Sequence, residues 1–574
     1  MTYSLKEVFS PKLLHTLRHY SGRKFGQDAL AGIIVGIVAI PLAIAFGISS
    51  GVGPTEGLVT AIIAGLLISV FGGSKVQIGG PTGAFIVIIY GIIQQYGLSG
   101  LTIATIMAGI LLILMGLTHM GSVIKFVPYP VIVGFTAGIA LTIFSTQMND
   151  FFGLGLKDVP ANFIDKWIFY SQHFHVNGWA LGIGLFSLLI CICMPLLTKR
   201  IPGSLAAIIL ATLAVWALKT WAPASWGVGS LQTISDLYEL PRGIPAPHMP
   251  AMNLQDDESF FTLIQKLFPS AFTIAMLGAI ESLLSAMVAD GVIGDKHNSN
   301  TELIAQGVAN VAVPFFGGIP ATGAIARTMT NINNGGRTPV AGIIHAVVLL
   351  LVLLFLGRLV GMIPMSCLAA VLIMVAYSMS GWKTIRGLIK HPNRDLAVLG
   401  ITFLLTVIFD LTVAIEVGIL LALVLFLMRT SEETHIRTFH KEIDPNEDTD
   451  VQSNLEHLII PEGVEVYEID GPYFFGIANR FDDVMAHVSG EKYPIRIIRM
   501  RKVPFVDSTA IHNLSMLIQR SHREGMTIIL SGVKEHVHKQ LKTGGIEQMM
   551  NPKNICPNIH VALNRAQQLI DQKE

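Results

Sequence analysis

The sequence predicts a polytopic α-helical membrane protein that ends in a small soluble α/β domain. Of its 574 residues 52% are apolar and only 14% are charged, whereas soluble proteins carry about a quarter charged residues. Long stretches without Asp, Glu, Lys or Arg include 29–55, 76–124, 126–149, 303–326 and 359–382. Each can hold a membrane span of about 20 residues, and beyond residue 455 short strand patterns alternate with helix patterns.

Residues 1–27 predict a cytoplasmic N-terminal segment rather than a cleaved signal peptide. They are polar and lack a small-residue cleavage site. Five of them are basic, namely Lys6, Lys12, Arg18, Arg23 and Lys24. Because cytoplasmic flanks of membrane spans are enriched in Lys and Arg, we expect the N-terminus in the cytoplasm.

Residues 28–430 predict a transmembrane transport domain of about fourteen hydrophobic segments. An even number returns the C-terminus to the cytoplasm, so we expect both termini on that side of a bacterial inner membrane. Within this domain GGPTGAF (79–85) is echoed by GGIPATGAI (317–325). If the fourteen segments divide into two sevens, each motif falls in the third segment of its half. An odd number per half predicts repeats of inverted topology.

Each repeated motif predicts a membrane segment that is interrupted at mid-membrane. An extended piece would run into Pro81 or Pro320, and a half-helix would begin just after the proline. Interrupted backbone is tolerated in a bilayer only where it lines a cavity or is wrapped by protein. Two half-helices that start at the same depth direct N–H groups and positive dipole ends at one point, which makes an anion site. The alternative for either motif alone is a kinked, closely packed helix.

Two charged residues fall inside predicted membrane segments. Arg327 lies about one turn into the second half-helix, where it can bind the anion or add positive potential; its alternative role is to satisfy backbone carbonyls or a carboxylate. Glu281 lies in an apolar helix with Ser285 four residues further on, hence on the same face. Such a pair can hold a cation or a proton, and the alternative is a salt bridge to a neighbouring helix, for example to Arg327.

The C-terminal part predicts a charged linker at 431–454 and an α/β domain at 455–574. Strand patterns are VEVYEID (464–470), IRIIRM (495–500) and TIILSGV (527–533). Helix patterns are FDDVMAHV (481–488), VDSTAIHNLSMLIQRSHREG (506–525), which is a turn into an amphipathic helix, and KEHVHKQLKTGG (534–545). The formal net charge of zero gives no indication of a nucleic-acid partner. Because the sequence shows no nucleotide loop, catalytic triad or metal-ligand cluster, we predict no enzyme, no cofactor and no metal site.

Several long motifs in order resemble the SulP family of anion transporters. They are DALAGIIVGIVAIPLAIAFGISSGVGPTEGL, IGGPTGAF, VPYPVIVGFTAGIA, LGAIESLLSAMVAD, GGIPATGAIARTMTNINNGGRTPVAG and, near the C-terminus, VDSTAIHNL. The resemblance covers nearly the whole chain. It implies a seven-plus-seven inverted repeat with core and gate subdomains, an elevator movement of the core against the gate, a homodimer and a C-terminal STAS-like domain with a possible cytoplasmic partner.

The resemblance also implies a substrate site. Its residues are Gly80, Thr82, Gly83 and Ala84 in the third segment and Thr322, Gly323, Ala324 and Arg327 in the tenth. Phe85, Ile40 and Ala43 are expected as apolar walls. Nucleobase permeases share the fold but place an acidic residue in the tenth segment, where this chain has Arg327, so we expect an anion.

The coupling ion is predicted from positions at which this chain differs from the sodium-coupled members of the family. Sodium-coupled bicarbonate transporters tend to have aspartate at the position of Glu281, threonine at that of Ser285 and a hydroxyl near Ile325. This chain keeps a carboxylate and a hydroxyl, but Ile325 offers no oxygen ligand. We therefore expect proton coupling through Glu281, with Ser285 beside it.

The predicted function is secondary active transport of a small anion, with sulfate as the first candidate and bicarbonate as the second. The alternatives are a sodium-coupled bicarbonate or C4-dicarboxylate transporter, an uncoupled anion channel or exchanger, and a membrane-anchored scaffold that works through its STAS-like domain. Anti-sigma-factor antagonists, which the STAS-like domain resembles, can be phosphorylated at a serine that matches Ser508. Ser508 would be a helix N-cap, with or without such a phosphate.

Overall fold

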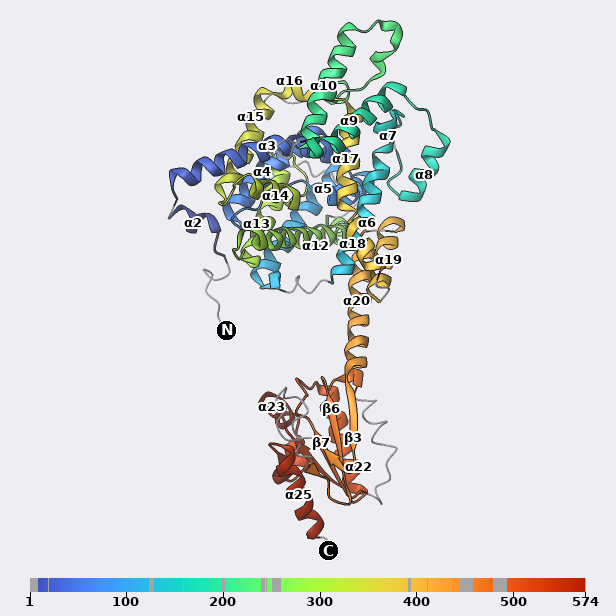
Figure 1. Cartoon of the computed structure of the whole chain (residues 1–574). Coiled ribbons are helices and arrows are strands. Elements are labelled where there is room, and N and C mark those ends of the chain that lie inside the picture. Colours follow the sequence, from blue (N-terminus) through green and yellow to red (C-terminus); the bar gives the residue numbers. More distant parts are fainter. Residues whose placement is uncertain are drawn as a thin grey trace. The chain divides into compact units, whose positions relative to one another are not determined.

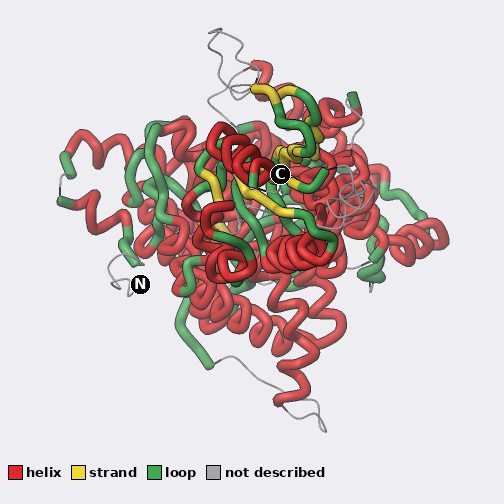
Figure 2. The backbone as a smooth tube through the Cα atoms, turned by 90° about the horizontal axis from the view of Figure 1, so that it is seen from below, coloured by secondary structure: helices red, strands yellow, loops and turns green. Residues whose placement is uncertain are grey.

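The chain divides into two compact units, Met1–Leu420 and Leu421–Glu574 (Figure 1). The computed structural model describes residues 9–18, 20–122, 128–157, 159–197, 202–238, 243, 245–249, 260–390, 394–409, 411–443, 458–477 and 493–572. Helices make up most of the described chain, and strands are confined to a few places (Figure 2). This distribution follows the long charge-free stretches of the sequence.

Seven segments form the first half of the membrane unit. They are α3 (Gly22–Ser49), α4 (Pro54–Phe71), two segments within α5 (Ile86–Leu117), α6 (Tyr129–Thr146), α9 (Gly178–Leu197) and α10 (Gly203–Trp221). The long α5 counts as two because Gly97 has a non-helical conformation with φ 65°. The first part of α5 is preceded by the strand β1 (Gly79–Gly80) and the turn η1 (Gly83–Phe85).

Seven segments form the second half. They are α12 (Phe260–Ile293), α13 (Ser299–Ala312), β2 (Thr322–Gly323) with α14 (Ile325–Asn333), α15 (Val340–Phe355), α17 (Met365–Met379), α19 (Arg394–Ile408) and α20 (Leu411–Glu433). The predicted fourteen segments in two halves are thus confirmed, and each repeated motif lies in the third segment of its half. Eight of the described helices are long and apolar enough to cross a membrane by themselves.

Short elements connect these segments. They are α2 (Lys12–Leu17), η2 (Met120–Ser122), α7 (Met148–Phe152), α8 (Phe163–Gln172), η4 (Ala224–Trp226), η5 (Val228–Ser230), α11 (Ile234–Leu237), η6 (Val313–Phe316), α16 (Gly357–Gly361) and α18 (Trp382–Ile389).

The membrane helices pack as two groups, in agreement with the expected core and gate. In the core group α3, α4, α5, α12, α13, α14 and α15 pack on one another, and in the gate group α6, α9, α10, α17 and α19 do so. Close helix packing in a bilayer depends on small residues rather than on exclusion of water. The contact of α5 with α13 shows this, because a Cβ on Gly109 would lie 2.8 Å from the Gly307 carbonyl oxygen.

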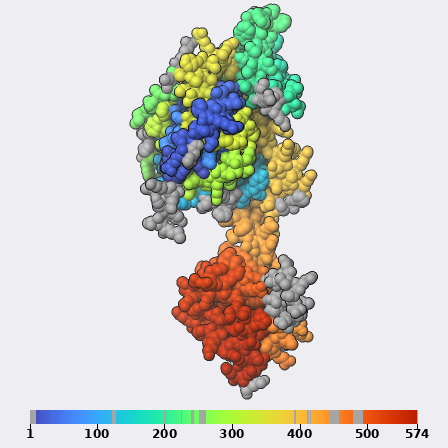
Figure 3. Space-filling model, turned by 60° about the vertical axis from the view of Figure 1, so that its left-hand side comes forward, coloured from blue at the N-terminus to red at the C-terminus, as the bar shows by residue number. Residues whose placement is uncertain are grey.

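A buried carboxylate ties the start of α3 to the start of α15. Asp28, 1% exposed, accepts hydrogen bonds from the Arg337 N–H at 2.9 Å, the Thr338 hydroxyl at 2.6 Å and the Tyr20 hydroxyl at 2.9 Å. The N-terminal helix (blue) accordingly lies against yellow-green residues of the second half (Figure 3). The two halves of the core group therefore interlock through polar as well as apolar contacts.

The C-terminal unit contains a five-stranded sheet in the order β3–β6–β7–β8–β9. The strands are β3 (His435–Phe439), β6 (Val464–Asp470), β7 (Ile495–Arg499), β8 (Thr527–Ser531) and β9 (Ile555–Cys556), and the helices are α22 (Ser508–Arg523), α23 (Glu535–Thr543), α24 (Ile546–Met549) and α25 (Ile559–Asp571). Strand β3 is antiparallel to β6 and the other pairs are parallel. The predicted strands and two of the predicted helices are confirmed, and the helix predicted at 481–488 lies outside the described residues.

The two faces of this sheet alternate along each strand. Tyr467, Ile498 and Leu530 belong to the apolar cluster of α22 and α23, whereas Val466 and Ile497 pack with α25. This alternation follows from the two-residue period of a β-strand.

The prediction of a linker at 431–454 was wrong for its described part. Helix α20 continues to Glu433, β3 follows at His435–Phe439, and β4 (Glu442–Ile443) pairs with β5 (Leu458–Ile459). Strand β3 looked like a linker because it lies at the sheet edge, where its polar side chains are exposed. Pairing with β6, rather than a buried apolar face, stabilises it.

Candidate functional site

The two interrupted segments meet at their breaks. Strands β1 and β2 pair antiparallel, with Gly79 opposite Gly323 and Gly80 opposite Thr322. A further backbone hydrogen bond runs from the Ala324 N–H to the Ile78 carbonyl at 3.0 Å. The extended backbone thus satisfies its own polar groups away from lipid, as an interrupted span must.

A helix begins directly after each strand. Thr82 is the N-cap of η1, and its hydroxyl accepts from the Ala84 N–H at 3.5 Å before the chain enters α5. Helix α14 starts at Ile325, and the Thr328 N–H donates to the Ala324 carbonyl at 2.9 Å. The first N–H groups of a helix have no acceptor within that helix, and they carry a partial positive charge. Both helix N-termini consequently lie beside the same two-stranded sheet.

Side chains of α14 hold the strand that leads to the first break. The Thr328 hydroxyl accepts from the Ile78 N–H at 3.1 Å, and the Asn331 amide donates to the Val76 carbonyl at 2.8 Å. Gln77 donates in turn to the Ser282 carbonyl of α12 at 3.1 Å. These buried bonds fix the depth and direction of β1.

The second break has a matching set of contacts, from α13 of its own half and from α4 of the first half. The Asn310 side chain donates to the Ala321 carbonyl at 2.8 Å and accepts from the Ala321 N–H at 2.9 Å, as a paired strand would. The Thr60 hydroxyl of α4 accepts from the Ile319 N–H at 2.8 Å. Each interrupted segment is therefore held by polar side chains of its neighbours.

Two glycines at the breaks are required by space and by conformation. Gly80 has φ +149°, and a Cβ there would lie 2.3 Å from Nη1 of Arg327. A Cβ on Gly323 would lie 1.5 Å from Nε2 of Gln77. The site predicted at these glycines thus depends on the absence of their side chains.

Arg327 combines the two roles that its sequence position suggested. The side chain is 2% exposed, and its guanidinium donates to the carbonyl of Gly79 at 3.5 Å and to that of Pro81. It also lines a cavity. The arginine therefore clamps the carbonyls of the first break while its positive charge stays beside the cavity.

A cavity of about 560 Å³ opens beside the two helix N-termini. Its walls come from the core group (α3, η1, α12 and α14), from α6, α17 and α18, and from Ile419 of α20. Polar side chains in the wall include Thr82, Thr136, Glu281, Arg327, Ser378 and Thr384. Most of the remaining wall is apolar, so a bound ion would meet few polar groups other than those at the breaks.

The predicted site residues fall into two sets. Thr82, Gly83, Gly323, Ala324, Arg327 and Glu281 line the cavity. Gly80, Ala84, Phe85, Thr322 and Ser285 are buried behind it. Thr322, for example, donates to the Gly278 carbonyl at 2.9 Å. Residues of the second set do not line the cavity, but they pack against the residues that do.

Glu281 and Ser285 do not form the predicted pair. The Glu281 carboxylate interacts with the Thr82 hydroxyl and with the charge of Arg327. Ser285, which is 1% exposed, donates to the Thr328 hydroxyl at 3.2 Å instead. The i, i+4 spacing placed both residues on one side of α12, but each found a partner on a different segment.

The apolar wall from α3 also differs from the prediction. Leu42 and Phe46 line the cavity, whereas Ile40 and Ala43 were expected there. Tyr129 and Met379 line it as well. Their apolar side chains carry no signal in the sequence, since only the packing of α6 and α17 against the breaks brings them to the cavity.

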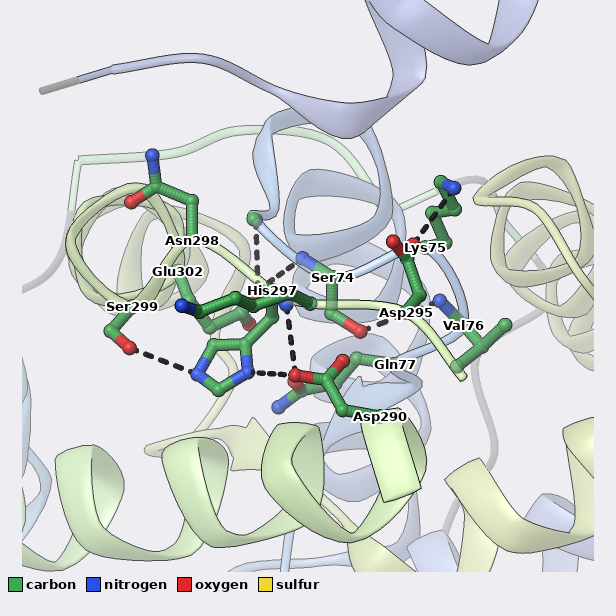
Figure 4. Close-up of polar contacts among 12 residues, drawn as sticks. Ser74, Lys75, Val76, Gln77, Asp290, Asp295, His297, Asn298, Ser299 and Glu302 are labelled. Carbon is green, nitrogen blue, oxygen red and sulfur yellow. Dashed lines mark hydrogen bonds and ion pairs between the residues drawn. The ribbon is translucent and has the colours of Figure 1, made fainter. Parts of the chain in front are cut away.

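A buried carboxylate outside the cavity holds the loop 72–78 that leads into β1 (Figure 4). Glu302 accepts from the backbone N–H groups of Gly73 at 2.9 Å and Ser74 at 3.1 Å, and from the Gln306 amide at 2.9 Å. Glu302 was not predicted from the sequence as a residue of the site. The spacing of Glu302, Gln306 and Asn310 was its signal, because it puts three polar residues on one face of an otherwise apolar helix.

The loop before α13 is fixed by a second polar set (Figure 4). Nδ1 of His297 lies 2.7 Å from the Asp290 carboxylate, and Nε2 lies 3.0 Å from the Ser299 hydroxyl. Nearby, Lys75 pairs with Asp295 at 2.8 Å. In the described part of the chain, no group of three or more His, Cys, Asp or Glu side chains is arranged to hold a metal ion.

Ser508 is exposed and is the first residue of α22, but it is not the N-cap that was predicted. Asp507 caps the helix, because its carboxylate accepts from the Ala510 N–H at 2.8 Å and from the Phe475 N–H at 3.0 Å. A carboxylate is already the stronger acceptor at this helix start.

Two family descriptions match the chain. Residues 25–402 match the sulfate permease family and residues 458–562 match the STAS domain. The first match includes both interrupted segments and every wall of the cavity except its single contribution from α20.

Individual proteins show the same likeness. YvdB of Bacillus subtilis, whose name describes it as a candidate sulfate transporter, is 42% identical over 91% of this chain and 94% of its own length. The transmembrane domain of a cyanobacterial bicarbonate transporter, BicA, matches with a TM-score of 0.59 at 29% identity, over 70% of this chain and 98% of that domain. The murine anion transporter Slc26a9 in its inward-facing state has a TM-score of 0.84 at 20% identity, over 99% of this chain and 96% of its own, which shows a shared fold.

Proposed function

This chain belongs to the sulfate permease family, and we propose that it transports a small anion across the membrane by secondary active transport, with sulfate as the first candidate and bicarbonate as the second. Anion transport is the activity of the family. Its relatives include proteins named for sulfate and for bicarbonate. The substrate within this class, the coupling ion and the mechanism are the proposal.

The observation that carries the proposal is the pairing of β1 with β2 beside the cavity. It brings the N-termini of two helices to one point. Helix N-termini bind anions through free N–H groups and the positive end of the helix dipole. Arg327 adds a full positive charge at the same wall, so the site favours a compact anion over a cation or a neutral solute.

Proton coupling is proposed through Glu281. Its carboxylate lies at the cavity wall beside Thr82 and within the field of Arg327. A negative carboxylate next to an anion site opposes anion binding, and a proton on that carboxylate removes the opposition. Proton and anion would then bind together, which is the requirement for symport.

The mechanism is proposed to be an elevator. The breaks and Glu281 all belong to the core group, whereas α6 and α17 of the opposite wall belong to the gate group. A rigid shift of the core group against the gate group would carry the anion site without rebuilding it. The further expectations are a homodimer, an inner-membrane location with both termini cytoplasmic, a partner for the STAS domain and phosphorylation at Ser508.

The test is uptake of labelled sulfate, bicarbonate and fumarate into proteoliposomes under an imposed proton or sodium gradient. The proposal predicts proton-driven accumulation of sulfate or bicarbonate. It predicts that Glu281→Gln abolishes accumulation, while the exposed control Asp165→Asn retains it.

Other outcomes select the alternatives. Sodium-driven uptake of bicarbonate or of a dicarboxylate would indicate a sodium symporter, and flux that ignores both gradients would indicate a channel or exchanger. Absence of flux for every anion would contradict the proposal.

A further inference from the structure

Helix α18 (Trp382–Ile389) has no buried residue. It follows α17 after Gly381, whose left-handed conformation (φ 61°) turns the chain out of the α17 axis. A short helix that directly follows a membrane segment and has only partly buried and exposed residues needs an environment that suits its exposed side chains.

The exposed side of α18 has a basic and an apolar part. Lys383, Arg386 and the C-cap residue Lys390 recur at spacings of three and four residues, which places them on one side of α18 and its end. Trp382 is 55% exposed and Ile389 is 53% exposed. They are seven residues apart and therefore share the neighbouring face. The helix thus presents an apolar edge directly beside a row of cations.

The position of α18 connects this surface to the transport site. Gly381 and Thr384 line the cavity, together with Ser378 and Met379 at the end of α17. The helix also packs against α6 and α19. One side of α18 is therefore part of the cavity wall, and the other side faces away from it.

We infer that α18 lies in the membrane interface and binds the headgroups of anionic phospholipids. Tryptophan and basic residues are the side chains that anchor helices at the level of the headgroups. A helix with an apolar edge and a basic edge lies in the interface plane, and its cations attract anionic lipids. A phospholipid satisfies both edges at once, because its acyl chains cover Trp382 and Ile389 while its phosphate meets the three cations.

Binding of such a lipid would act on transport through Thr384. A headgroup held by Lys383 and Arg386 fixes the orientation of α18, and Thr384 lies between those two residues in the sequence. The cavity wall that α18 contributes would then be ordered by the lipid. We accordingly expect anion uptake to be faster in vesicles that contain anionic lipid than in vesicles of neutral lipid alone.

The binding test uses the full chain in vesicles and does not depend on transport. The contribution of Trp382 to fluorescence is the difference between the wild type and Trp382→Phe. Brominated phosphatidylglycerol and brominated phosphatidylcholine are compared as quenchers at equal mole fraction. We expect phosphatidylglycerol to quench Trp382 about twofold more strongly or better, since each basic residue contributes roughly a five-fold preference for an anionic surface.

The variants are Lys383→Gln/Arg386→Gln/Lys390→Gln and the control Lys157→Gln/Arg358→Gln, which removes two exposed cations, one from the loop after α7 and one from α16. The triple variant should be quenched equally by both lipids, and the control should behave as wild type. Soluble glycerol phosphate added to phosphatidylcholine vesicles should leave the signal unchanged.

Equal quenching of the wild type by both lipids would overturn the inference, as would an unchanged preference in the triple variant. Weak quenching by both lipids would do the same, because it would place Trp382 outside the membrane. If lipid binding is seen but uptake is equal in vesicles with and without phosphatidylglycerol, the regulatory part is wrong.

Discussion

Arg327 shows how one side chain can serve structure and electrostatics together. Its guanidinium donates to the carbonyls of Gly79 and Pro81 while it lines the cavity. A lysine at the same position would keep the charge but could not reach both carbonyls with a fixed fork. The geometry of the donor is therefore as important as its charge.

Arg327→Lys is expected to reduce anion uptake by roughly tenfold or more, since a hydrogen bond to a charged group is worth about 1.5–3 kcal/mol. Uptake rates in proteoliposomes measure this effect, with the exposed Arg358→Lys as control. Uptake near the wild-type rate for Arg327→Lys, with none for Arg327→Gln, would show that charge alone suffices.

Gly80→Ala is expected to abolish uptake. The added Cβ meets Arg327 at 2.3 Å in a conformation that alanine rarely adopts, and strained backbone of this kind costs on the order of 1–3 kcal/mol. The control is Gly91→Ala, where a Cβ would meet no atom within 4 Å. Both variants are assayed for uptake and for thermal stability. A fully active Gly80→Ala protein would contradict the proposed clamp.

At the scale of elements, the interrupted segments were predictable because glycine and proline mark them in the sequence. An extended piece followed by a half-helix at each break was expected from this pattern, whereas the pairing of β1 with β2 was not. The side chains that hold the breaks were not predicted. Thr328, Asn331 and Asn310 are ordinary polar residues in the sequence, and their role arises only where distant segments meet.

Asn310→Ala is expected to lower the thermal midpoint of the full-length protein clearly. It leaves the buried N–H and carbonyl of Ala321 without their partner, and each unsatisfied buried group costs about 1–3 kcal/mol. The matched control is Asn334→Ala, because the Asn334 amide donates only to the Thr330 carbonyl of its own helix. Equal midpoints for the two variants would show that the Asn310 bonds do not stabilise the break.

The pairing of Glu281 with Thr82 rather than Ser285 illustrates a general limit of helical periodicity. The period gives the face of a helix correctly, but the partner depends on what packs against that face. For the same reason the residues of α3 that line the cavity are Leu42 and Phe46 and not Ile40 or Ala43. Which side of α3 faces the cavity is decided by the helices that pack against it, and a single sequence does not contain these contacts.

At the scale of the molecule, the division into a membrane unit and an α/β unit was evident from hydropathy and from the change of period. The boundary was less predictable, because the edge strand β3 has a polar sequence typical of a linker. Its place in the sheet is determined by pairing with β6, a long-range contact that local composition does not reveal.

The α/β unit depends on buried ion pairs across its central strands. Glu465 pairs with Arg496, and both side chains are at most 3% exposed. Glu465→Ala leaves the arginine charge buried, which costs about 3–5 kcal/mol. We expect faster proteolysis of this unit in the full-length chain. The control Glu535→Ala removes an exposed pair with Lys539 and should change the rate little; equal rates would show that the buried pair does not stabilise the fold.

We propose that the two helix N-termini hold the anion. The most direct measurement is anomalous diffraction from crystals of the full chain grown with selenate, which has the shape and charge of sulfate. We expect one strong peak in the cavity, about 3 Å from N–H groups at the start of η1 and α14. A selenate site elsewhere, or an empty cavity in protein that transports sulfate, would contradict it.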